Sequence, residues 1–580
     1  MDSSDLLASV RDTSDETEFY TPIPDGYLKG HVKYVVVLGT VMSGLGKGIF
    51  SSSLARLLQG KGLRVAPIKL EGYLNVDSGT LNPFRHGEVF VLDDGMECDM
   101  DLGTYERMLD QNLTRDNFTT SGQIYSSILE RERRGEYLGR DVQMIPHVTA
   151  EVKLRLRRLA VKSKADVIFV EIGGTAGDFE NGYYIEAMRQ LAYEEGEGNV
   201  LFVALTFILE PPSLGEQKSK AAQLGIKQLL QMGIQPHIIA CRAQHEVTDK
   251  VREKISVYTN VPKARVFSMH DCESIYLIPS RIRESQIDQQ VMHLLDLTDR
   301  VKPREEVRHW AAWETFVNRI LAPKAEVAIG ITGKYVSVRD SYASMLMALE
   351  HAGAYHQVKV TPVWIDTTSI TDENAAEALE NVQGIIVPGG FGTRGTEGKI
   401  ACVRYAREHN LPYLGLCYGF QMAVIEYARN VCGLAGANST EIDPQCKHPV
   451  IDMLPEQKKI EGLGGNMRLG GRQVEIKPGT LASRLFGGAR SVRLRFRHRY
   501  EVDPRYIAQL EKGGLVFSGK APDQPIMQLL ELPEHRYFVG TQSHPEMTSR
   551  PLTPSPLFVG LVAAALGREV AAVERLAARV

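Results

Sequence analysis

A cysteine and a distant histidine–glutamate pair are the residues of this chain best suited to chemistry. Residues 415–421 read GLCYGFQ, which places Cys417 between two glycines on a predicted sharp turn from a strand into a helix. A thiol at a helix N-terminus ionises more readily and becomes a better nucleophile. Residues 544–546 read His-Pro-Glu, offering an imidazole to accept the thiol proton and a carboxylate to orient that imidazole. The pattern predicts a triad of Cys417, His544 and Glu546, the layout of enzymes that hydrolyse glutamine.

Acyl transfer to such a cysteine forms an oxyanion, which needs two N–H donors close by. Residues 384–395 read GIIVPGGFGTRG, a glycine turn at the end of a predicted strand. We expect the backbone N–H groups of Gly390 and Tyr418 to be these donors.

A glycine-rich loop at residues 39–48, GTVMSGLGKG, predicts a second site. It lies between a predicted strand and a predicted helix, where backbone N–H groups bind phosphate oxygens. Lys47 is placed to neutralise the β- and γ-phosphates of a nucleoside triphosphate. The loop departs from the Walker A pattern, because six residues separate Gly39 from Gly46 and because Gly48 replaces the usual Ser or Thr ligand of Mg²⁺. We therefore expect carboxylates to hold the metal.

Two carboxylates are candidates for that role. Glu171 ends the apolar run DVIFVE directly before Gly173 and Gly174, so it is expected at the carboxyl edge of a parallel sheet, where ligands bind. Asp101 belongs to the acidic run Asp99-Met-Asp101. That run taken alone favours a solvated loop, but Mg²⁺ prefers one or two carboxylates together with substrate phosphates. The sequence thus predicts Mg²⁺ at Asp101 and Glu171.

Alternating strand and helix patterns are expected to position both sites. In the N-terminal half, strands are predicted at residues 32–40, 63–72, 165–174, 199–209 and 235–243, with a helix at 49–62. Strand, glycine loop, helix and strand form a βαβ unit, which indicates an α/β fold with a parallel sheet. In the C-terminal half, strand-rich segments are predicted at residues 325–333, 384–390, 411–419 and 537–546.

Composition limits the classes of protein that this chain can represent. With 580 residues it is too long for one core, so two or three domains are expected. A net charge of −4 gives no reason to expect nucleic acid or an anionic membrane as a partner. No run of about 18 apolar residues and no signal-peptide pattern occur, and the seven cysteines show no metal-ligand or disulfide spacing. We expect a cytoplasmic enzyme.

Both halves resemble the CTP synthase family, whose members make CTP from UTP. The resemblance extends over about residues 31–570 and is carried by the run from Lys47 to Leu109 and by VQMIPHVT (142–149), EIGGTAGDFE (171–180) and ESIYLIP (273–279). It implies a P-loop, dethiobiotin-synthetase-like amidoligase domain and a class I glutamine amidotransferase domain. ATP would phosphorylate the uracil 4-oxygen, and ammonia channelled from glutamine hydrolysis would displace the phosphate. The boundaries that we predict are a disordered acidic arm (1–30), a synthetase domain (31–295), a linker helix (296–323), an amidotransferase domain (324–570) and a tail (571–580).

The resemblance assigns further roles position by position. Lys69, at the end of the second strand, would stabilise the charge of the phosphoryl group in transfer. ATP would be bound by Ser43, Gly44, Leu45, Gly46, Lys47, Gly48 and Ile49, with adenine at His270, Asp271 and Cys272. UTP or inhibitory CTP would be bound by Gln143, Asp178, Phe179, Glu180, Lys218, Ser219, Lys220, Gln223 and Lys254. Glutamine would be bound by Gly390, Tyr418, Gln421, Glu441 and Arg499. GTP is implied as an activator at a lid over 462–470, and a homotetramer that also forms filaments is implied as the assembly.

The departures from the family gather where the pyrimidine nucleotide is expected. The usual Asp-Pro-Tyr reads Glu71-Gly72-Tyr73, and the usual GVGDIE or TVGDIE followed by Ser-Leu-Pro-Phe reads AGDFENGYY (176–184). Near the cysteine, Tyr418 and Phe420 replace the commoner Leu and Met. We expect weaker inhibition by CTP, or a uridine nucleotide other than plain UTP as acceptor.

Two rival functions are weighed against this one. A P-loop amidoligase that amidates carboxylates of cobalt-corrin precursors would share the enzyme class. However, Lys218, Lys220 and Lys254 favour a polyphosphate acceptor. A catalytically silent filament or regulatory relative would lack function at the triad, at Lys47 or at the metal carboxylates, and all of these residues are present.

Overall fold

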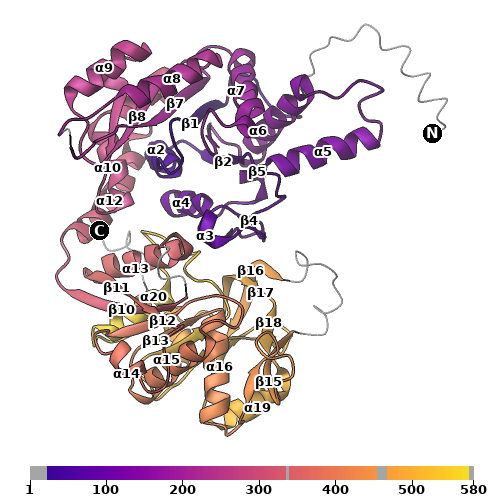
Figure 1. Ribbon diagram of the computed structural model, residues 1–580, viewed down its shortest axis with the longest axis vertical. Helices are drawn as coiled ribbons and strands as arrows, with labels where there is room; N and C mark the ends of the chain where they lie inside the picture. The colour runs from indigo at the N-terminus through magenta and orange to yellow at the C-terminus, as the bar shows by residue number, and fades with distance from the viewer. Residues whose placement is uncertain (1–21, 214, 335–338, 454–466, 574–580) are drawn as a thin grey trace. The chain divides into compact units, whose positions relative to one another are not determined.

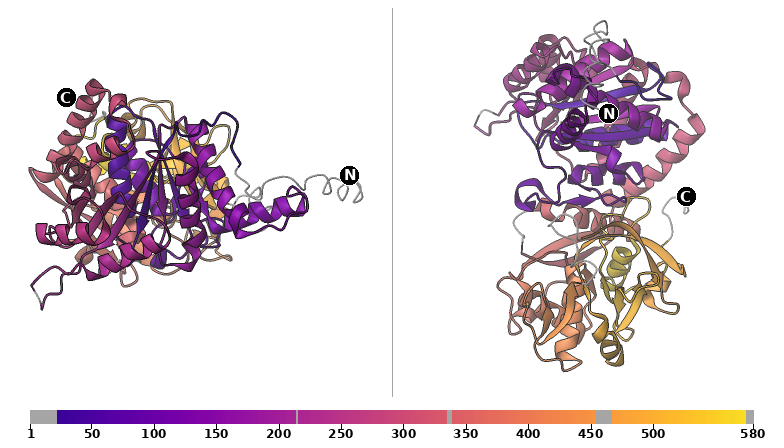
Figure 2. Two further views of the ribbon diagram at one scale, coloured as in Figure 1. Left: turned by 90° about the horizontal axis from the view of Figure 1, so that it is seen from above. Right: turned by 90° about the vertical axis from the view of Figure 1, so that its right-hand side faces the viewer.

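The chain folds into two compact units in the computed structural model, which describes residues 22–573 except 214, 335–338 and 454–466 (Figures 1 and 2). The first unit comprises Met1–Asp77 and Leu113–Trp310, and the second comprises Ser78–Asn112 and Ala311–Val580. Most of the predicted acidic arm, most of the predicted tail and residues 462–466 of the predicted lid lie outside the described residues. Within the described part of the chain, no helix is long and apolar enough to cross a membrane.

A seven-stranded sheet forms the centre of the first unit, with the strand order β5-β2-β6-β1-β7-β8-β9. Every neighbouring pair of strands in it is parallel. The strands are β1 (Lys33–Gly39), β2 (Val65–Glu71), β5 (Phe118–Thr120), β6 (Val167–Ile172), β7 (Val200–Phe207), β8 (Ile238–Ala243) and β9 (Val266–His270). All residues of β1 and β6 are buried, as expected for a parallel sheet covered by helices on both faces.

Helices cover this sheet and connect its strands (Figure 1). They are α2 (Lys47–Gly60), α5 (Ser121–Arg133), α6 (Thr149–Ser163), α7 (Gly182–Glu195), α8 (Lys220–Gln231), α9 (Asp249–Thr259), α10 (Ile278–Glu284) and α11 (Ile287–Leu294). Apolar side chains of α6, α7, α8 and α9 pack on one face of β1 through Tyr34, Val36 and Leu38. A helix, α12 (Pro303–Leu321), lies within the predicted linker at 296–323.

A nine-stranded sheet forms the centre of the second unit, in the order β11-β10-β12-β13-β21-β20-β19-β16-β17. Its parallel part consists of β11 (Lys359–Asp366), β10 (Glu326–Gly333), β12 (Gly384–Val387), β13 (Tyr413–Leu416) and β21 (Phe538–Thr541). Its antiparallel part consists of β20 (Met527–Glu531), β19 (Val516–Lys520), β16 (Arg468–Ile476) and β17 (Ser491–His498). A small sheet contains β14 (Ala437–Ser439), β15 (His448–Met453) and β18 (Tyr500–Val502).

Two apolar clusters cover the faces of this larger sheet. One contains side chains of α13 (Ala343–His356) and α20 (Pro556–Ala565), and the other contains side chains of α15 (Thr396–Glu408) and α16 (Tyr418–Asn430). The shorter helices of the unit are α14 (Ala375–Ala378), α18 (Leu481–Leu485) and α19 (Pro504–Lys512). The strands β12, β13 and β21 therefore end between two helical layers, and the predicted triad lies at these strand ends.

The segment Ser78–Asn112 packs within the second unit, although the sequence boundaries assign it to the synthetase domain. It contains α3 (Pro83–His86), the strand pair β3 (Phe90–Val91) and β4 (Glu97–Cys98), and α4 (Met100–Leu109). Three arginines at alternate positions of β17 form ion pairs with its acidic side chains: Arg493 with Asp93 (2.8 Å), Arg495 with Glu106 (2.8 Å) and Arg497 with Glu97 (2.7 Å). Because alternate residues of a strand share one face, this ladder binds the segment along one side of β17.

Candidate active site

Cys417 occupies a strained turn between β13 and α16. Its backbone has φ 47° and ψ −94°, a conformation that side chains other than glycine adopt rarely. A Cβ atom on Gly419 would lie 2.1 Å from the carbonyl oxygen of Val387, and one on Gly415 would lie 2.3 Å from the hydroxyl of Tyr413. Both glycines are therefore required by close packing, and the predicted turn is present as a nucleophile elbow.

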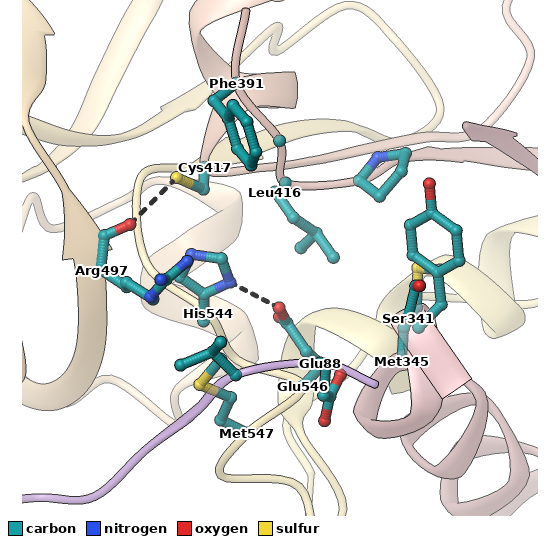
Figure 3. Close-up of a pocket in the computed structure, with 15 residues that line it drawn as sticks. Glu88, Ser341, Met345, Phe391, Leu416, Cys417, Arg497, His544, Glu546 and Met547 are labelled. Atoms are coloured by element: carbon teal, nitrogen blue, oxygen red, sulfur yellow. Dashed lines mark hydrogen bonds and ion pairs between the residues drawn. The ribbon is translucent and has the colours of Figure 1, made fainter. Parts of the chain in front are cut away.

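The Cys417 side chain opens onto a cavity of about 130 Å³ (Figure 3). His544 and Glu546, from the loop after β21, line the same cavity. The Nδ1 atom of His544 lies 2.6 Å from Oε1 of Glu546. Its Nε2 atom is buried and has no hydrogen-bond partner among the described residues, so this nitrogen remains available to the thiol. The fold thus brings the three predicted triad residues together.

Electrostatics in this cavity favour a protonated imidazole. Burial lowers the pKa of His544, but the negative charges of Glu546 and of the Cys417 thiolate outweigh burial and raise it well above its ordinary value. An imidazolium beside a thiolate is the resting state of many cysteine nucleophiles. His544 can therefore hold the proton that a departing amine needs.

The glycine loop after β12 lies beside these groups. A Cβ atom on Gly389 would lie 3.0 Å from Cε1 of His544 and 3.8 Å from Cβ of Cys417. Gly390 also lines the cavity, and within the described residues its N–H group has no hydrogen-bond partner. The N–H of Tyr418, in the first turn of α16, has no intrahelical acceptor. Both predicted oxyanion donors are thus placed next to the nucleophile.

The other predicted glutamine ligands surround this loop. Oε1 of Glu441 accepts a hydrogen bond from the N–H of Gly392 (3.0 Å). Burial raises the pKa of Glu441, whereas Arg499 contributes a nearby positive charge that lowers it. The amide of Gln421 donates to the carbonyl of Tyr500 (3.1 Å) and is directed into the protein.

Three residues at the cavity were missed from the sequence. Nε2 of Gln542 lies 3.5 Å from Sγ of Cys417, and the thiol lies 3.6 Å from the carbonyl oxygen of Arg497. Gln542 lies two residues before His544 in the sequence. Its position next to the predicted triad histidine could have indicated that it lies near the thiol. Glu88, from the segment Ser78–Asn112, lines the same cavity, and nothing in its local sequence indicates this.

Glu88 is partly buried at the N-terminus of α13. Both of its carboxylate oxygens accept the N–H of Ser344 (3.0 and 3.1 Å), and the Ser344 hydroxyl also bonds to Oε1. Burial raises the pKa of Glu88 to about 7, in part offset by these bonds and by Arg107. A carboxyl group that titrates near neutrality thus lines the cavity of the triad.

In the first unit, the glycine-rich loop has the geometry of a phosphate-binding turn. Gly44 and Gly46 have φ of 75° and 79°, and Gly46 caps α2. Nζ of Lys47 donates to the carbonyl oxygen of Gly174 (2.7 Å), so the lysine spans the crevice at the ends of β1 and β6. Ser43, Leu45, Gly48 and Ile49 belong to the same loop and the first turn of α2.

The predicted phosphoryl-transfer residues lie at the ends of β2 and β6. Nζ of Lys69 is 3.3 Å from Oε1 of Glu71 and 3.6 Å from Oε1 of Glu171. Lys69 and Glu171 are both buried. Asp101 belongs to the second unit, in the first turn of α4, where its N–H bonds to Asp99. No cluster of three metal-ligating side chains occurs among the described residues.

The predicted pyrimidine-nucleotide residues are more open. Glu180, Lys220, Lys254 and Gln143 are exposed, and Phe179 is 97% exposed. Asp178 accepts the N–H (2.6 Å) and hydroxyl (2.7 Å) of Thr175, which fixes the turn that follows β6. The remaining predicted ligands lie at element ends: Lys218, Ser219 and Gln223 around the start of α8, and His270, Asp271 and Cys272 after β9.

Comparison with known proteins identifies the family. Residues 33–297 match the family model described as CTP synthase N-terminus, and residues 337–564 match glutamine amidotransferase class-I. The chain is 49% identical over 538 residues to the CTP synthase of Thermococcus gammatolerans, covering 93% of this chain and 99% of that protein. The chain belongs to the CTP synthase family. It is also 48% identical over 539 residues to the CTP synthase of Thermus thermophilus, covering 92% of this chain and 97% of that protein.

Among solved structures, the glutaminase domain of Trypanosoma brucei CTPS with bound acivicin is 35% identical. It covers 42% of this chain and 95% of that chain, with a TM-score of 0.40. Membership of the CTP synthase family and the predicted pair of α/β domains are both confirmed by the family matches. The rival functions drawn from the sequence are not favoured by these relatives, all of which carry one enzyme name.

Proposed function

We propose that this chain is a glutamine-hydrolysing CTP synthase, which aminates UTP at the 4-position with ammonia from glutamine and with ATP as co-substrate. One observation carries the proposal: 49% identity to a CTP synthase over 99% of that protein. Cys417, His544 and Glu546 line one cavity, and His544 contacts Glu546; this arrangement supports the proposal independently.

Glutamine hydrolysis would begin with attack of the Cys417 thiolate on the side-chain amide carbon. The oxyanion that forms would be stabilised by the N–H groups of Gly390 and Tyr418. The His544 imidazolium would protonate the leaving nitrogen as the thioester forms, and ammonia would depart. Neutral His544 would then take a proton from water, which hydrolyses the thioester to glutamate. Glu546 would keep the imidazole oriented throughout.

Synthesis would begin with phosphorylation of the uracil 4-oxygen. Lys47 would neutralise the β- and γ-phosphates of ATP, and Lys69 would stabilise the charge of the phosphoryl group in transfer. Ammonia would attack C4 and displace inorganic phosphate. Asp101 and Glu171 would hold Mg²⁺, which when bound offsets the negative charge of the phosphates.

The remaining assignments follow the family resemblance. ATP would contact Ser43, Gly44, Leu45, Gly46, Gly48, Ile49, His270, Asp271 and Cys272. UTP would contact Gln143, Asp178, Phe179, Glu180, Lys218, Ser219, Lys220, Gln223 and Lys254. Glutamine would contact Gln421, Glu441 and Arg499. We also propose GTP as an activator, a homotetramer as the assembly, and the cytoplasm as the location.

Replacement of Cys417 tests whether glutamine hydrolysis and CTP formation occur at separate sites. Cys417→Ala should abolish CTP formation with glutamine but leave formation with an ammonium salt near the wild-type rate. Cys432→Ala, a change at another cysteine of the same unit, is the matched control and should affect neither reaction. Loss of ammonium-dependent synthesis in a folded Cys417→Ala protein would contradict the proposal, as would retention of glutamine-dependent synthesis.

A further inference from the structure

The loop that carries Gly390 is rich in glycine, and its shape depends on side chains outside it. Four of the eight residues in the segment 388–395 are glycines: Gly389, Gly390, Gly392 and Gly395. Glycines lose much backbone freedom on ordering, so such a loop presents an oxyanion donor in one direction only if other groups anchor it.

Two carbonyl groups that flank Gly390 are anchored by side chains of neighbouring helices. The hydroxyl of Tyr418 donates to the carbonyl oxygen of Gly392 (2.7 Å) and lies 3.0 Å from the hydroxyl of Thr396. Nζ of Lys399, on α15, donates to the carbonyl oxygen of Pro388 (3.3 Å). The N–H of Gly392 is held by Glu441 in addition (3.0 Å). The chain is therefore held at Pro388 on one side of Gly390 and at Gly392 on the other.

Tyr418 and Lys399 also contact each other. Nζ of Lys399 lies 5.3 Å from the centre of the Tyr418 ring, within the range of a cation–π interaction. Both side chains are buried behind the loop, at 3% exposure each. Burial raises the pKa of Tyr418, so its hydroxyl keeps the proton that it donates to Gly392.

We infer that Tyr418 is a positioning residue that joins the two halves of the oxyanion hole. Its backbone N–H is one donor, and its hydroxyl fixes the loop that carries the other donor. Leu, the residue that Tyr418 replaces in the family resemblance, has no hydroxyl and cannot form this bond. The inference rests on the proposed glutaminase function of Cys417.

The test is Tyr418→Phe, which removes only the hydroxyl. Loss of a whole oxyanion donor lowers kcat by about 10²–10³-fold. A donor that is loosened rather than lost should lower the kcat of glutamine hydrolysis by roughly ten-fold. The KM for glutamine should change less than about two-fold. The oxyanion forms in the transition state and not in the bound substrate, so a weaker oxyanion donor lowers kcat rather than substrate binding. Ammonium-dependent CTP synthesis should be unchanged, which also verifies folding.

Tyr427→Phe is a matched control on the same helix. The Tyr427 hydroxyl donates to the carbonyl of Gly513 (2.8 Å), so the variant loses an equivalent bond at a distant loop. It should leave glutamine hydrolysis at the wild-type rate. Alkylation of Cys417 by iodoacetamide, which forms no oxyanion, should proceed equally in both variants and in the wild-type protein.

An unchanged kcat in Tyr418→Phe would overturn the inference. So would a rise in KM alone, or slower alkylation, because each would place the hydroxyl in substrate binding or in activation of the thiol instead. These outcomes are separate from failure of the proposed function, which would appear as glutamine hydrolysis surviving in Cys417→Ala.

Discussion

Nδ1 of His544 lies 2.6 Å from Oε1 of Glu546. Through this contact the negative charge of Glu546 affects the protonation of His544. Glu546 is one of two negative groups that raise the pKa of His544 against the opposing effect of burial. The imidazolium in turn stabilises the thiolate of Cys417, so the carboxylate acts on the sulfur through the ring.

Glu546→Gln should therefore lower the pKa of His544 and alter the pH profile of Cys417 alkylation. The measurement is alkylation by iodoacetamide at a series of pH values, with Cys417 followed by mass spectrometry among the seven cysteines. Glutamine hydrolysis should fall by about 10²-fold or more, as when a triad orienter is lost. A pH profile identical to that of the wild-type protein would contradict the assignment of Glu546.

Lys399 should make folding stability depend on pH. Burial lowers its pKa from 10.5 to about 7 in the folded protein, with Lys334 adding to the effect and Cys402 and Cys417 opposing it. The unfolded chain then binds more protons between these two values, so the free energy of unfolding rises with pH across that window. Below pH 7 the full cost of a buried ammonium is present.

Lys399→Met should consequently raise the free energy of unfolding, measured by urea denaturation, at neutral and lower pH by an amount on the order of a few kcal/mol. The gain should shrink as pH rises toward 10.5. Lys512→Met, at an exposed lysine of α19, is the control and should show no such trend. A constant gain at every pH would mean that improved packing, rather than relief of a buried charge, is responsible.

The buried pair of Glu106 and Arg495 should contribute strongly to the second unit. Glu106 is 0% exposed and also accepts Arg550 (3.3 Å), so Glu106→Gln leaves two buried guanidinium groups without their carboxylate. Breaking such a pair costs about 3–5 kcal/mol. Urea unfolding should show this loss for Glu106→Gln. Asp93→Asn, which alters the more exposed pair with Arg493, should lose less than about 1 kcal/mol. Equal losses of stability in Glu106→Gln and Asp93→Asn would contradict the expected difference between the buried pair and the exposed pair.

Magnesium dependence should follow the two carboxylates. Asp101→Asn and Glu171→Gln should each abolish CTP formation with glutamine or ammonium as nitrogen source, while basal glutamine hydrolysis continues. Glu130→Gln, at an exposed position of α5, serves as the control. Titration of ammonium-driven synthesis with Mg²⁺ is the measurement, and a wild-type titration curve in either carboxylate variant would rule out its role as a ligand.

Inhibition by CTP should be weaker here than in relatives with the usual sequence at residues 71–73 and 176–184. These two segments contact each other, so their substitutions have to be tested together. A Cβ atom on Gly72 would lie 2.9 Å from Oδ1 of Asn181, and the Tyr184 hydroxyl donates to the Glu71 carbonyl (3.2 Å). Restoring Pro at 72 alone should therefore destabilise the fold. Restoring the family residues at 72, 179 and 181–184 together should restore CTP inhibition of UTP turnover. Strong CTP inhibition of the unaltered protein would show that these substitutions are neutral.

The sequence predicted the central strands and the turn at Cys417 because their signals are local. The strands β1, β2, β6, β7 and β8 are apolar runs bounded by glycine, and the elbow at Cys417 depends on glycines two residues away. The helix α12 lies within the range predicted for the linker. Strands such as β5, with three residues, and β16, with exposed and buried positions mixed, give no comparable pattern and were missed.

Long-range packing accounts for the rest. Glu88 reaches the triad cavity only because the segment Ser78–Asn112 packs against β17, and its partners are far away in sequence. The anchoring of Gly392 by Tyr418 likewise depends on a loop and a helix that meet only in the folded unit. Neither contact has a periodicity or spacing that a single sequence reveals.

The arginine ladder of β17 also limits how this protein can be recombined in evolution or in the laboratory. A gene exchange that replaced residues 324–570 would replace β17 with the strand of another protein. Asp93, Glu97 and Glu106 would then keep their negative charges but lose the arginines that pair with them. A viable chimaera must therefore inherit the segment Ser78–Asn112 from the same parent as its amidotransferase. The heritable module is discontinuous, and the crossover points that preserve it lie near residues 77, 112 and 311.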